Sequence, residues 1–357
     1  MSHHNDRLSL DVHPHHHHHH HSLTPPIYLL KLHSIYLISR RLNLDINFSQ
    51  PQALQYFITT QPGVYNYAIL RLSDGTTLDN STFTAPYFNP WGYLSTNDTD
   101  NVLILGSAPQ VGLQVKSYSV QTNSLTNVYD GQSQYSFSFK IQPIVWDPVS
   151  LVASVAGLSM ANEYGALAII QFGFGQQTPK SAINLGVQGG TFNTAPIGAY
   201  DGSNYYYIYY NMGATIGLVK YSFKDYTFSK TVLNQEGGDI VGSQSLFFYN
   251  NQIYLASVYS KVGVTISTIN YQTGDIAIIY SDSNIKKGFT QTIQTFVFDQ
   301  DTGSIIILNV ENDNLYVDIF DVTTETVTSS ILDNTIPPNT NTIAVSTYTI
   351  PSASFSN

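Results

Sequence analysis

From about residue 53 onward, the chain alternates short hydrophobic runs with pairs of turn-forming residues. The runs are rich in Tyr, Phe, Val, Ile and Thr, and their apolar positions recur at every second residue rather than at a helical spacing. Asp-Gly, Asn-Asn and Thr-Gly pairs separate the runs, and such pairs favour tight turns between antiparallel strands. The pattern predicts an all-β fold.

One turn recurs along the chain with a period of about 50 residues. Its six copies start at Leu70, Tyr118, Ile170, Tyr221, Ile269 and Phe320, so successive copies lie 48, 52, 51, 48 and 51 residues apart. A second marker, an aromatic residue followed by Asp or Asn, keeps the same period at Trp146, Tyr200, Tyr249 and Phe298. Two markers with one period predict a repeat architecture.

Each repeat is long enough for four strands joined by short loops. The fifth repeat predicts strands at 244–249, 252–260, 263–270 and 275–281, and the sixth predicts strands at 293–298, 304–310, 315–320 and 326–332. Four-stranded antiparallel units at this spacing are typical of β-propellers, which stack such sheets around a ring.

The body therefore resembles a six-bladed β-propeller of the loose family with Asp-x-x-Thr-Gly turns, such as the segment from Asp299 to Gly303. The resemblance is one of architecture and covers about 300 residues. It implies six four-stranded sheets of about 50 residues each. The alternatives are a two-sheet sandwich and two separate β domains.

The two ends of the body predict how the ring closes. Only one good strand, Ala53–Thr60, precedes the turn at Leu70, whereas Asn341–Ile350 forms a single alternating strand after the sixth repeat. A four-stranded first sheet therefore requires a strand from the far end of the chain. We predict that the C-terminal strand joins the first sheet and closes the ring.

Residues 1–50 differ from the body in composition. They contain all eleven histidines of the chain, seven of them consecutive at 15–21, followed by the apolar segment Ile27–Ile38. We interpret this region as a His-rich leader or affinity tag plus a short apolar segment, and residues 51–357 as the propeller. The apolar segment fits a damaged signal sequence or a short helix or strand packed on the body.

Charge and residue usage in the body exclude several functions. The body has 10 basic residues against 21 acidic ones, Arg71 is its one arginine, and it contains no histidine and no cysteine. Such a surface repels phosphate backbones, so we expect neither nucleic acid nor anionic lipid as a partner. A Ser-His-Asp triad, a histidine-ligated metal and a thiolate nucleophile are excluded as well. No apolar run is long enough to predict a membrane span.

Six residues are candidates for ligand binding: Trp91, Gln142, Glu236, Asp239, Gln244 and Gln294. Trp91 lies in the loop-like context Asn-Pro-Trp-Gly, which favours exposure. The three glutamines open predicted innermost strands, where they line the channel or satisfy backbone groups. Glu236 and Asp239 lie in a Gly-rich connection between blades, where a carboxylate pair suits glycoside cleavage, a bound cation or simple solvation.

Oxygen-rich and tyrosine-rich segments each admit two interpretations. The segments at 97–101 and 299–303 carry side-chain oxygens that calcium prefers, but the same residues build tight turns, which is the interpretation we favour. We therefore expect no cofactor, with calcium the one ion that these segments suit. The run Tyr205–Tyr210 fits a sugar-stacking surface or packing between blades, and alternation along a strand favours packing.

These observations lead to a functional hypothesis with one rival. The body has few Glu residues, one Arg and no His, which favours a non-catalytic, secreted or surface-exposed propeller that binds proteins or neutral glycans. Three Asn-x-Ser/Thr sequons, at Asn47, Asn80 and Asn97, mildly favour secretion. The rival is a carboxylate-based propeller enzyme, a glycosidase, lyase or lactonase, assisted by calcium. Fold alone does not choose between them.

Overall fold

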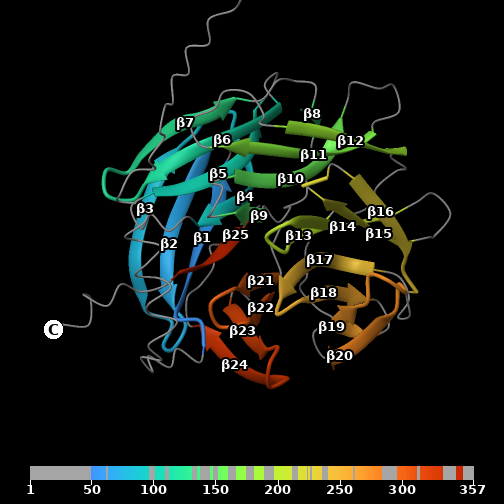
Figure 1. The fold of residues 1–357 in the computed structure, drawn as a ribbon. Coiled ribbons are helices and arrows are strands. Elements are labelled where there is room, and N and C mark those ends of the chain that lie inside the picture. Colours follow the sequence, from blue (N-terminus) through green and yellow to red (C-terminus); the bar gives the residue numbers. More distant parts are fainter. Residues whose placement is uncertain are drawn as a thin grey trace, which may run out of the picture. The chain divides into compact units, whose positions relative to one another are not determined.

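A computed structural model describes most of the body of the chain. The described residues are 50–61, 63–95, 101–108, 112–130, 135–136, 145–147, 152–159, 166–173, 181–188, 197–210, 216–222, 224–225, 227–234, 240–259, 262–283, 296–311, 314–332 and 343–348. All of them belong to the second of two compact units, Phe48–Asn357. Over these residues the protein is all-β, with 25 strands and no helix (Figure 1).

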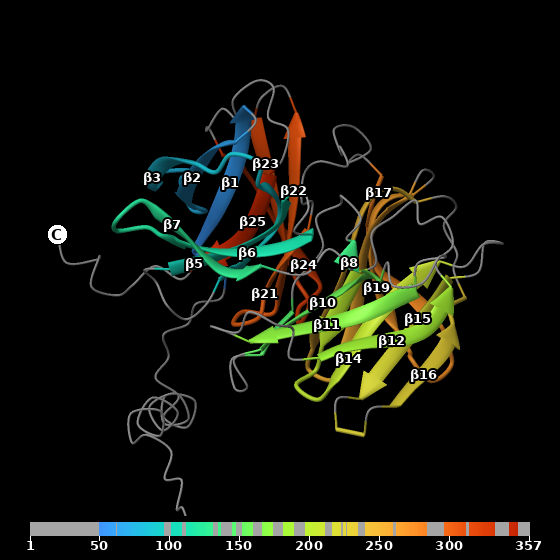
Figure 2. The same cartoon turned by 90° about the horizontal axis from the view of Figure 1, so that it is seen from above.

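The strands form six antiparallel sheets that follow one another along the chain (Figures 1 and 2). The first sheet contains β25 (Ile343–Tyr348), β1 (Ala53–Gln61), β2 (Val64–Arg71) and β3 (Thr77–Thr84). The second contains β4 (Asn89–Ser95), β5 (Asn101–Ala108), β6 (Gly112–Ser119) and β7 (Ser124–Asp130). The third contains β8 (Tyr135–Ser136), β9 (Val145–Asp147), β10 (Val152–Ser159), β11 (Ala166–Gly173) and β12 (Ser181–Gln188).

The remaining three sheets have four strands each, in chain order. The fourth contains β13 (Ile197–Tyr200), β14 (Asn204–Tyr210), β15 (Ile216–Ser222) and β16 (Thr227–Val232). The fifth contains β17 (Ile240–Tyr249), β18 (Gln252–Tyr259), β19 (Gly263–Ile269) and β20 (Ile276–Asp282). The sixth contains β21 (Phe296–Asp299), β22 (Ser304–Glu311), β23 (Asn314–Asp321) and β24 (Thr326–Leu332).

Hydrophobic faces of neighbouring sheets pack against one another, as an antiparallel sheet with two apolar faces requires. Between the first and second sheets, the ring of Tyr118 stacks on the ring of Phe83 with a centroid distance of 4.6 Å. Its centroid lies 5.4 Å from that of the Tyr67 ring. Leu54 and Leu70 of the first sheet share a buried cluster with residues of the sixth. Similar clusters join the fourth sheet to the fifth and the fifth to the sixth. The first strands of several sheets also contact each other, including β25 with β4 and β13 with β17.

The C-terminal strand belongs to the first sheet. β25 pairs antiparallel with β1 over six residue pairs, from Ala53 opposite Tyr348 to Ile58 opposite Ile343. The predicted strand at 341–350 is therefore present and lies next to the predicted partner strand. That the six sheets are six blades of one closed ring remains our prediction, which deletion of β25 and cross-linking of β25 to β1 test.

The two sequence markers occupy equivalent places in the sheets. All six copies of the first marker lie on the last strand but one of a sheet, near the point where it connects to the outermost strand. The second marker lies between the first and second strands, for example at Tyr249, which ends β17. The third sheet departs from the four-strand pattern, because both β8 and β9 pair with β10.

The turns at the first marker of the fifth and sixth sheets share one hydrogen-bonding pattern. In the fifth sheet, Asn270 accepts bonds on Oδ1 from the backbone of Gln272 and Thr273, at 3.0 and 3.3 Å. In the sixth, Asp321 accepts the equivalent bonds from its own turn, at 2.8 and 3.1 Å. The residue that ends each turn has a positive φ, 81° at Gly274 and 54° at Glu325. A short polar side chain and a left-handed residue thus define the turn.

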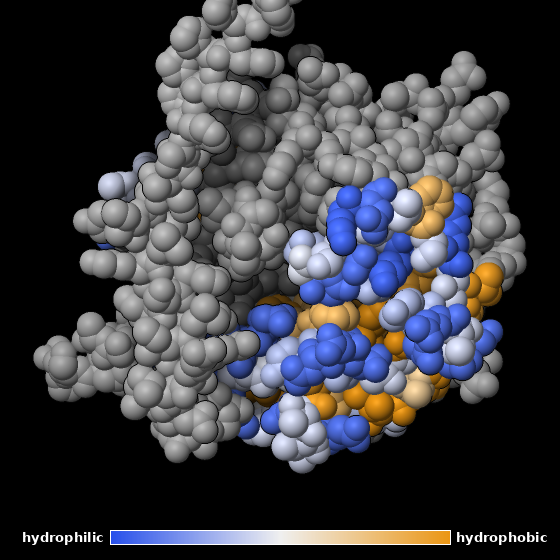
Figure 3. All heavy atoms as spheres, viewed as in Figure 1, coloured by the Kyte–Doolittle hydropathy of each residue, from blue (hydrophilic) through white to orange (hydrophobic). Residues whose placement is uncertain are grey.

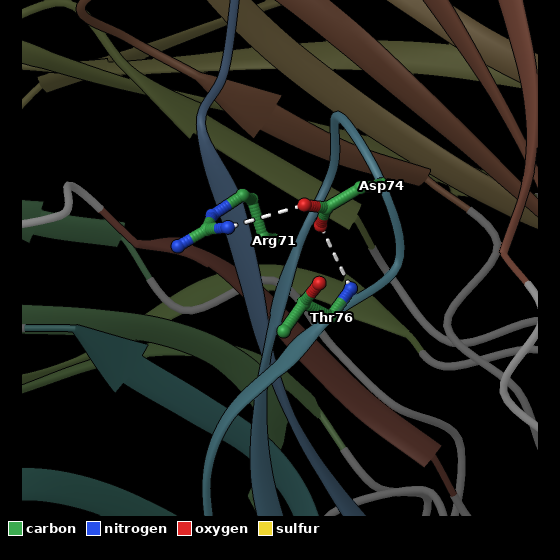
Figure 4. A network of polar contacts seen from close by, with 3 residues as sticks. All are labelled: Arg71, Asp74 and Thr76. Carbon is green, nitrogen blue, oxygen red and sulfur yellow. Dashed lines mark hydrogen bonds and ion pairs between the residues drawn. The ribbon is translucent and has the colours of Figure 1, made fainter.

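The turn of the first sheet uses a different acceptor (Figure 4). Asp74 accepts a bond on Oδ1 from the backbone N of Thr76 at 2.9 Å, and its Oδ2 lies 3.1 Å from Nη1 of Arg71. The backbone bond from Thr76 and, to a lesser degree, the guanidinium of Arg71 lower the pKa of Asp74. The pair is exposed to solvent, so its role is to fix the turn, not to stabilise the core.

Glu325 offers a test of this turn geometry. It adopts a positive φ without hydrogen-bonding its side chain in the turn, whereas Asn123, at φ 49°, donates to the backbone O of Thr82 at 3.1 Å and accepts from the Tyr118 hydroxyl at 2.9 Å. We expect Glu325→Gly to raise the free energy of unfolding by about 0.5–1 kcal/mol, because glycine relieves the left-handed strain. Asn123→Gly should lower it by about 1–2 kcal/mol through the lost hydrogen bonds. Urea denaturation measures both changes in the free energy of unfolding. If the two variants changed it in the same direction, the roles given to Glu325 and Asn123 in their turns would be wrong.

Candidate binding site

The turn between β3 and β4 exposes an aromatic side chain. Tyr87 is 82% exposed and has a φ of 65°, a left-handed conformation that is unusual for an aromatic residue. Its neighbours Ala85 and Phe88 are both buried. The turn therefore places a large ring in solvent while its two ends are anchored in the core.

Long-range hydrogen bonds fix the backbone of this turn. The N–H of Ala85 donates to the carbonyl of Gly63 at 2.8 Å, and the hydroxyl of the buried Tyr65 donates to the carbonyl of Phe88. Burial raises the pKa of Tyr65 to about 12, so this hydroxyl remains a donor at physiological pH. A Cβ at Gly63 would lie 3.2 Å from the Cα of Pro86, so the loop at Gly63 fits closely under the turn. The strain at Tyr87 is held by contacts that are distant in sequence.

The strand that follows the turn contains a bulge at Trp91. In the pairing of β4 with β5, Pro90 lies opposite Gly106 and Gly92 lies opposite Leu105, so Trp91 has no directly opposed residue. A bulge bends its strand and re-aims side chains, and bulges are frequent beside binding sites. Trp91 is the predicted aromatic candidate, and it lies on β4, four residues after Tyr87 in the chain. Tyr87 is not among the residues predicted from the sequence, because what distinguishes it is an exposed side chain on a fixed backbone. That backbone is fixed by contacts with Tyr65 and Gly63, which the sequence does not show.

A buried polar row crosses the fifth sheet. Gln244 on β17 donates from Nε2 to Oγ of Ser257 on β18 at 3.1 Å, and Ser257 lies opposite Thr265 on β19. All three residues are buried, and Oγ1 of Thr265 lacks a hydrogen-bond partner within the described part of the chain. The register of β17 shifts between Ile240 and Gln244, immediately before this row. Gln244 thus bonds to its own sheet.

The other predicted ligand-binding residues lie outside the described residues. They are Gln142, Glu236, Asp239 and Gln294. The chain places Asp239 directly before Ile240, the first residue of β17. That these four residues share a site with Gln244 or Trp91 therefore stays a prediction.

Two aspartates of the second marker have opposite pKa shifts. Asp201 is partly desolvated, but hydrogen bonds from Asn204, Ser203 and Tyr206 outweigh that effect and lower its pKa. Burial raises the pKa of Asp299, because only Thr302 and Asp301 donate to its carboxylate. Both carboxylates bond within their own turns, as the turn interpretation of the segment at 299–303 predicts.

Two tyrosines of the run 205–210 pack in the interior. Tyr205 and Tyr206 are buried, and the ring of Tyr206 stacks on Phe248 of the fifth sheet at a centroid distance of 5.9 Å. The Tyr206 hydroxyl donates to Oδ2 of Asp201 at 2.8 Å. For these two residues the packing interpretation is confirmed.

Comparisons with known proteins place the fold among the β-propellers. No family model matches the chain, and no curated protein sequence matches it. The chain is similar to TolB from Acinetobacter baumannii, with 12% identity and a TM-score of 0.55 over 88% of this chain and 71% of that one. It is also similar to a chain of a nidogen/laminin complex, with 11% identity and a TM-score of 0.51 over 82% and 98% of the two chains. A third similar structure is a putative 6-phosphogluconolactonase from Bacteroides fragilis, with 10% identity and a TM-score of 0.50 over 84% and 99%.

These similarities confirm the predicted fold class, an all-β propeller, and they show the fold alone. Among the described residues, no helix is long and apolar enough to cross a membrane. The same residues contain no group of three or more His, Asp or Glu side chains placed to hold a metal ion.

Proposed function

We propose that the protein is a secreted or surface-exposed β-propeller that binds a protein or a neutral glycan and catalyses no reaction. The observation that carries this proposal is the fixed turn at Tyr87. An exposed aromatic residue on a backbone that is already fixed loses less entropy on binding, and aromatic residues dominate the binding energy of many interfaces. A tyrosine also suits both candidate ligands, because its face packs on sugars and its hydroxyl forms hydrogen bonds.

The partners and location follow from the same features and from the charge of the chain. A body with 21 acidic and 10 basic residues favours neutral or basic partners over nucleic acid. Similar folds occur in a nidogen/laminin complex and in a putative lactonase, so the architecture itself is compatible with binding and with catalysis. We propose that no cofactor takes part, and calcium is the ion to include in the test.

Binding to a neutral glycan array and to intact cells tests the proposal, with and without calcium. We expect saturable binding by the wild-type protein and a loss of about tenfold or more in affinity for Tyr87→Ala, because a central aromatic contact is removed. Ile278→Ala, which shortens another exposed hydrophobic residue, is the matched control and should bind as the wild type does. Equal loss in both variants would contradict a specific role for Tyr87.

The rival enzyme is tested on the same protein with neutral polysaccharides and lactones as substrates. We expect no turnover by the wild type. Turnover that disappears in the double variant Glu236→Gln and Asp239→Asn, with substrate binding preserved, would overturn the proposal in favour of carboxylate catalysis.

A further inference from the structure

The outermost strand of the fourth sheet, β16, exposes hydrophobic side chains. Phe228 is 46% exposed and Val232 is 58% exposed. Among the residues whose burial is described, five large hydrophobic residues are exposed, and β16 carries two of them. Figure 3 shows hydrophobic side chains reaching the surface among hydrophilic ones in the region whose residues are coloured.

β16 is an edge strand whose outer side is free over most of its length. It pairs with β15 along one edge, and no described strand pairs with the other from Thr227 to Thr231. At the end of the strand, the carbonyl O of Val232 packs against Gly274, and Asn234 bridges Asp275. Phe228, Lys230 and Val232 alternate along the strand, so they share one face of the sheet. Nζ of Lys230 lies 5.3 Å from the centroid of the Phe228 ring. The face therefore presents an apolar, a basic and an apolar side chain in order.

The charge around this strand opposes that of the rest of the body. Residues 216–232 contain three lysines and one aspartate, which leaves 7 basic and 20 acidic residues elsewhere in the body. Lys220 is engaged with the fifth sheet, where its Nζ lies 4.6 Å from the centroid of the Tyr271 ring. Lys224 and Lys230 are exposed and give this edge a local positive charge.

Contacts with the fifth sheet hold β16 in place. Oγ1 of Thr231 donates to the carbonyl of Tyr271 at 2.7 Å, and the N–H of Asn234 donates to the carbonyl of Gly274 at 2.9 Å. Nδ2 of Asn234 also donates to Oδ1 of Asp275 at 3.1 Å. The edge is thus ordered before any partner arrives, which lowers the entropic cost of pairing.

We propose that β16 binds an extended acidic segment of a partner protein as an added strand. Backbone hydrogen bonds along the free edge from Thr227 to Thr231 supply affinity, and the partner side chains that face Phe228, Lys230 and Val232 supply specificity. The segment has the pattern apolar-x-acidic-x-apolar. Because this pattern reads the same in both directions, it fits a parallel or an antiparallel strand. This surface is separate from the turn at Tyr87, and the inference does not depend on the proposed function.

A labelled peptide, Thr-Val-Thr-Glu-Thr-Val-Thr, tests the inference by fluorescence anisotropy with the full-length protein. We expect saturable binding that weakens with salt, because the charge contact is exposed. Lys230→Glu should weaken binding about tenfold or more and should make the protein prefer the peptide with Lys in place of Glu. Phe228→Ser should also weaken binding, whereas Tyr87→Ala should not.

Ile278→Ser is the matched control, because Ile278 is 46% exposed on β20, the edge strand of the neighbouring sheet, without a lysine between two apolar residues. It should leave peptide binding unchanged. Three results would overturn the inference: equal loss in Ile278→Ser and Phe228→Ser, equal affinity for the Glu and Lys peptides, or no saturable binding. A wild-type dimer that Phe228→Ser converts to a monomer would also overturn it, since the occupant would then be a second copy.

Discussion

Deleting residues 341–357 is expected to destabilise the protein strongly. The deletion removes β25, which pairs with β1 from Ala53 to Ile58. Ala53 and Leu54, which are fully buried, would lose the strand that flanks them. The backbone groups of β1 that pair with β25 would lose their hydrogen-bond partners and become an exposed edge. We expect the free energy of unfolding to fall by at least about 4 kcal/mol, from lost burial and lost ladder hydrogen bonds.

Thermal and urea unfolding measure this effect, and two shorter deletions serve as controls. Deleting residues 349–357 leaves β25 whole and should change the unfolding midpoint little. Deleting residues 1–45 should also matter far less than losing β25. If the chain without residues 341–357 were as stable as the wild type, β25 would not complete the first sheet.

Gly274→Ala is expected to loosen the junction between the fourth and fifth sheets. Gly274 has a φ of 81°, and a Cβ there would lie 1.9 Å from the carbonyl O of Val232. The same glycine accepts the hydrogen bond from Asn234 that joins the two sheets. Strain and the backbone clash together should lower the free energy of unfolding by about 3 kcal/mol.

Gly202→Ala separates backbone strain from the clash. Gly202 also has a positive φ, 95°, but a Cβ there would meet nothing within 4 Å. We therefore expect a cost of only about 1 kcal/mol from the left-handed conformation. Urea denaturation of both variants gives the comparison, and equal losses would mean that the contact between Gly274 and Val232 is unimportant.

The strands and their order were predictable because burial imposes a period that the sequence displays. The predicted strands at 252–260 and 326–332 agree with β18 and β24 to within one residue. The recurring turns were predictable because a left-handed position and a short polar acceptor have few residue choices, as at Asn270 and Gly274. These are local properties, and local sequence encodes them.

The candidate site was much less predictable because it depends on contacts between distant residues. Trp91 was identified from its loop-like neighbours, but it lies within β4, at a bulge that the pairing with β5 creates. The turn that exposes Tyr87 is fixed by contacts with Tyr65 and Gly63, which lie more than 20 residues earlier in the chain. Gln244 was a candidate channel residue, and its bond to Ser257 depends on the register of β17 with β18. Sequence pattern alone does not report such contacts.

Cross-linking tests most directly our central claim that the chain closes into one ring where β1 pairs with β25. The chain contains no cysteine, so an introduced pair has no competing thiols. Tyr56 lies opposite Val345, and Phe57 lies opposite Ala344. Opposed residues of antiparallel strands have Cα atoms about 4.5–5.5 Å apart, which a disulfide can span.

The measurement is the yield of intramolecular disulfide after mild oxidation, by mass and by gel mobility without reductant. We expect at least one of the two opposed pairs, Tyr56→Cys with Val345→Cys or Phe57→Cys with Ala344→Cys, to cross-link nearly completely. Phe57→Cys with Tyr348→Cys, displaced by four residues or roughly 13 Å along the strand, should not. Failure of both opposed pairs in the folded protein, or equal yield from the displaced pair, would contradict closure of the ring at β1 and β25.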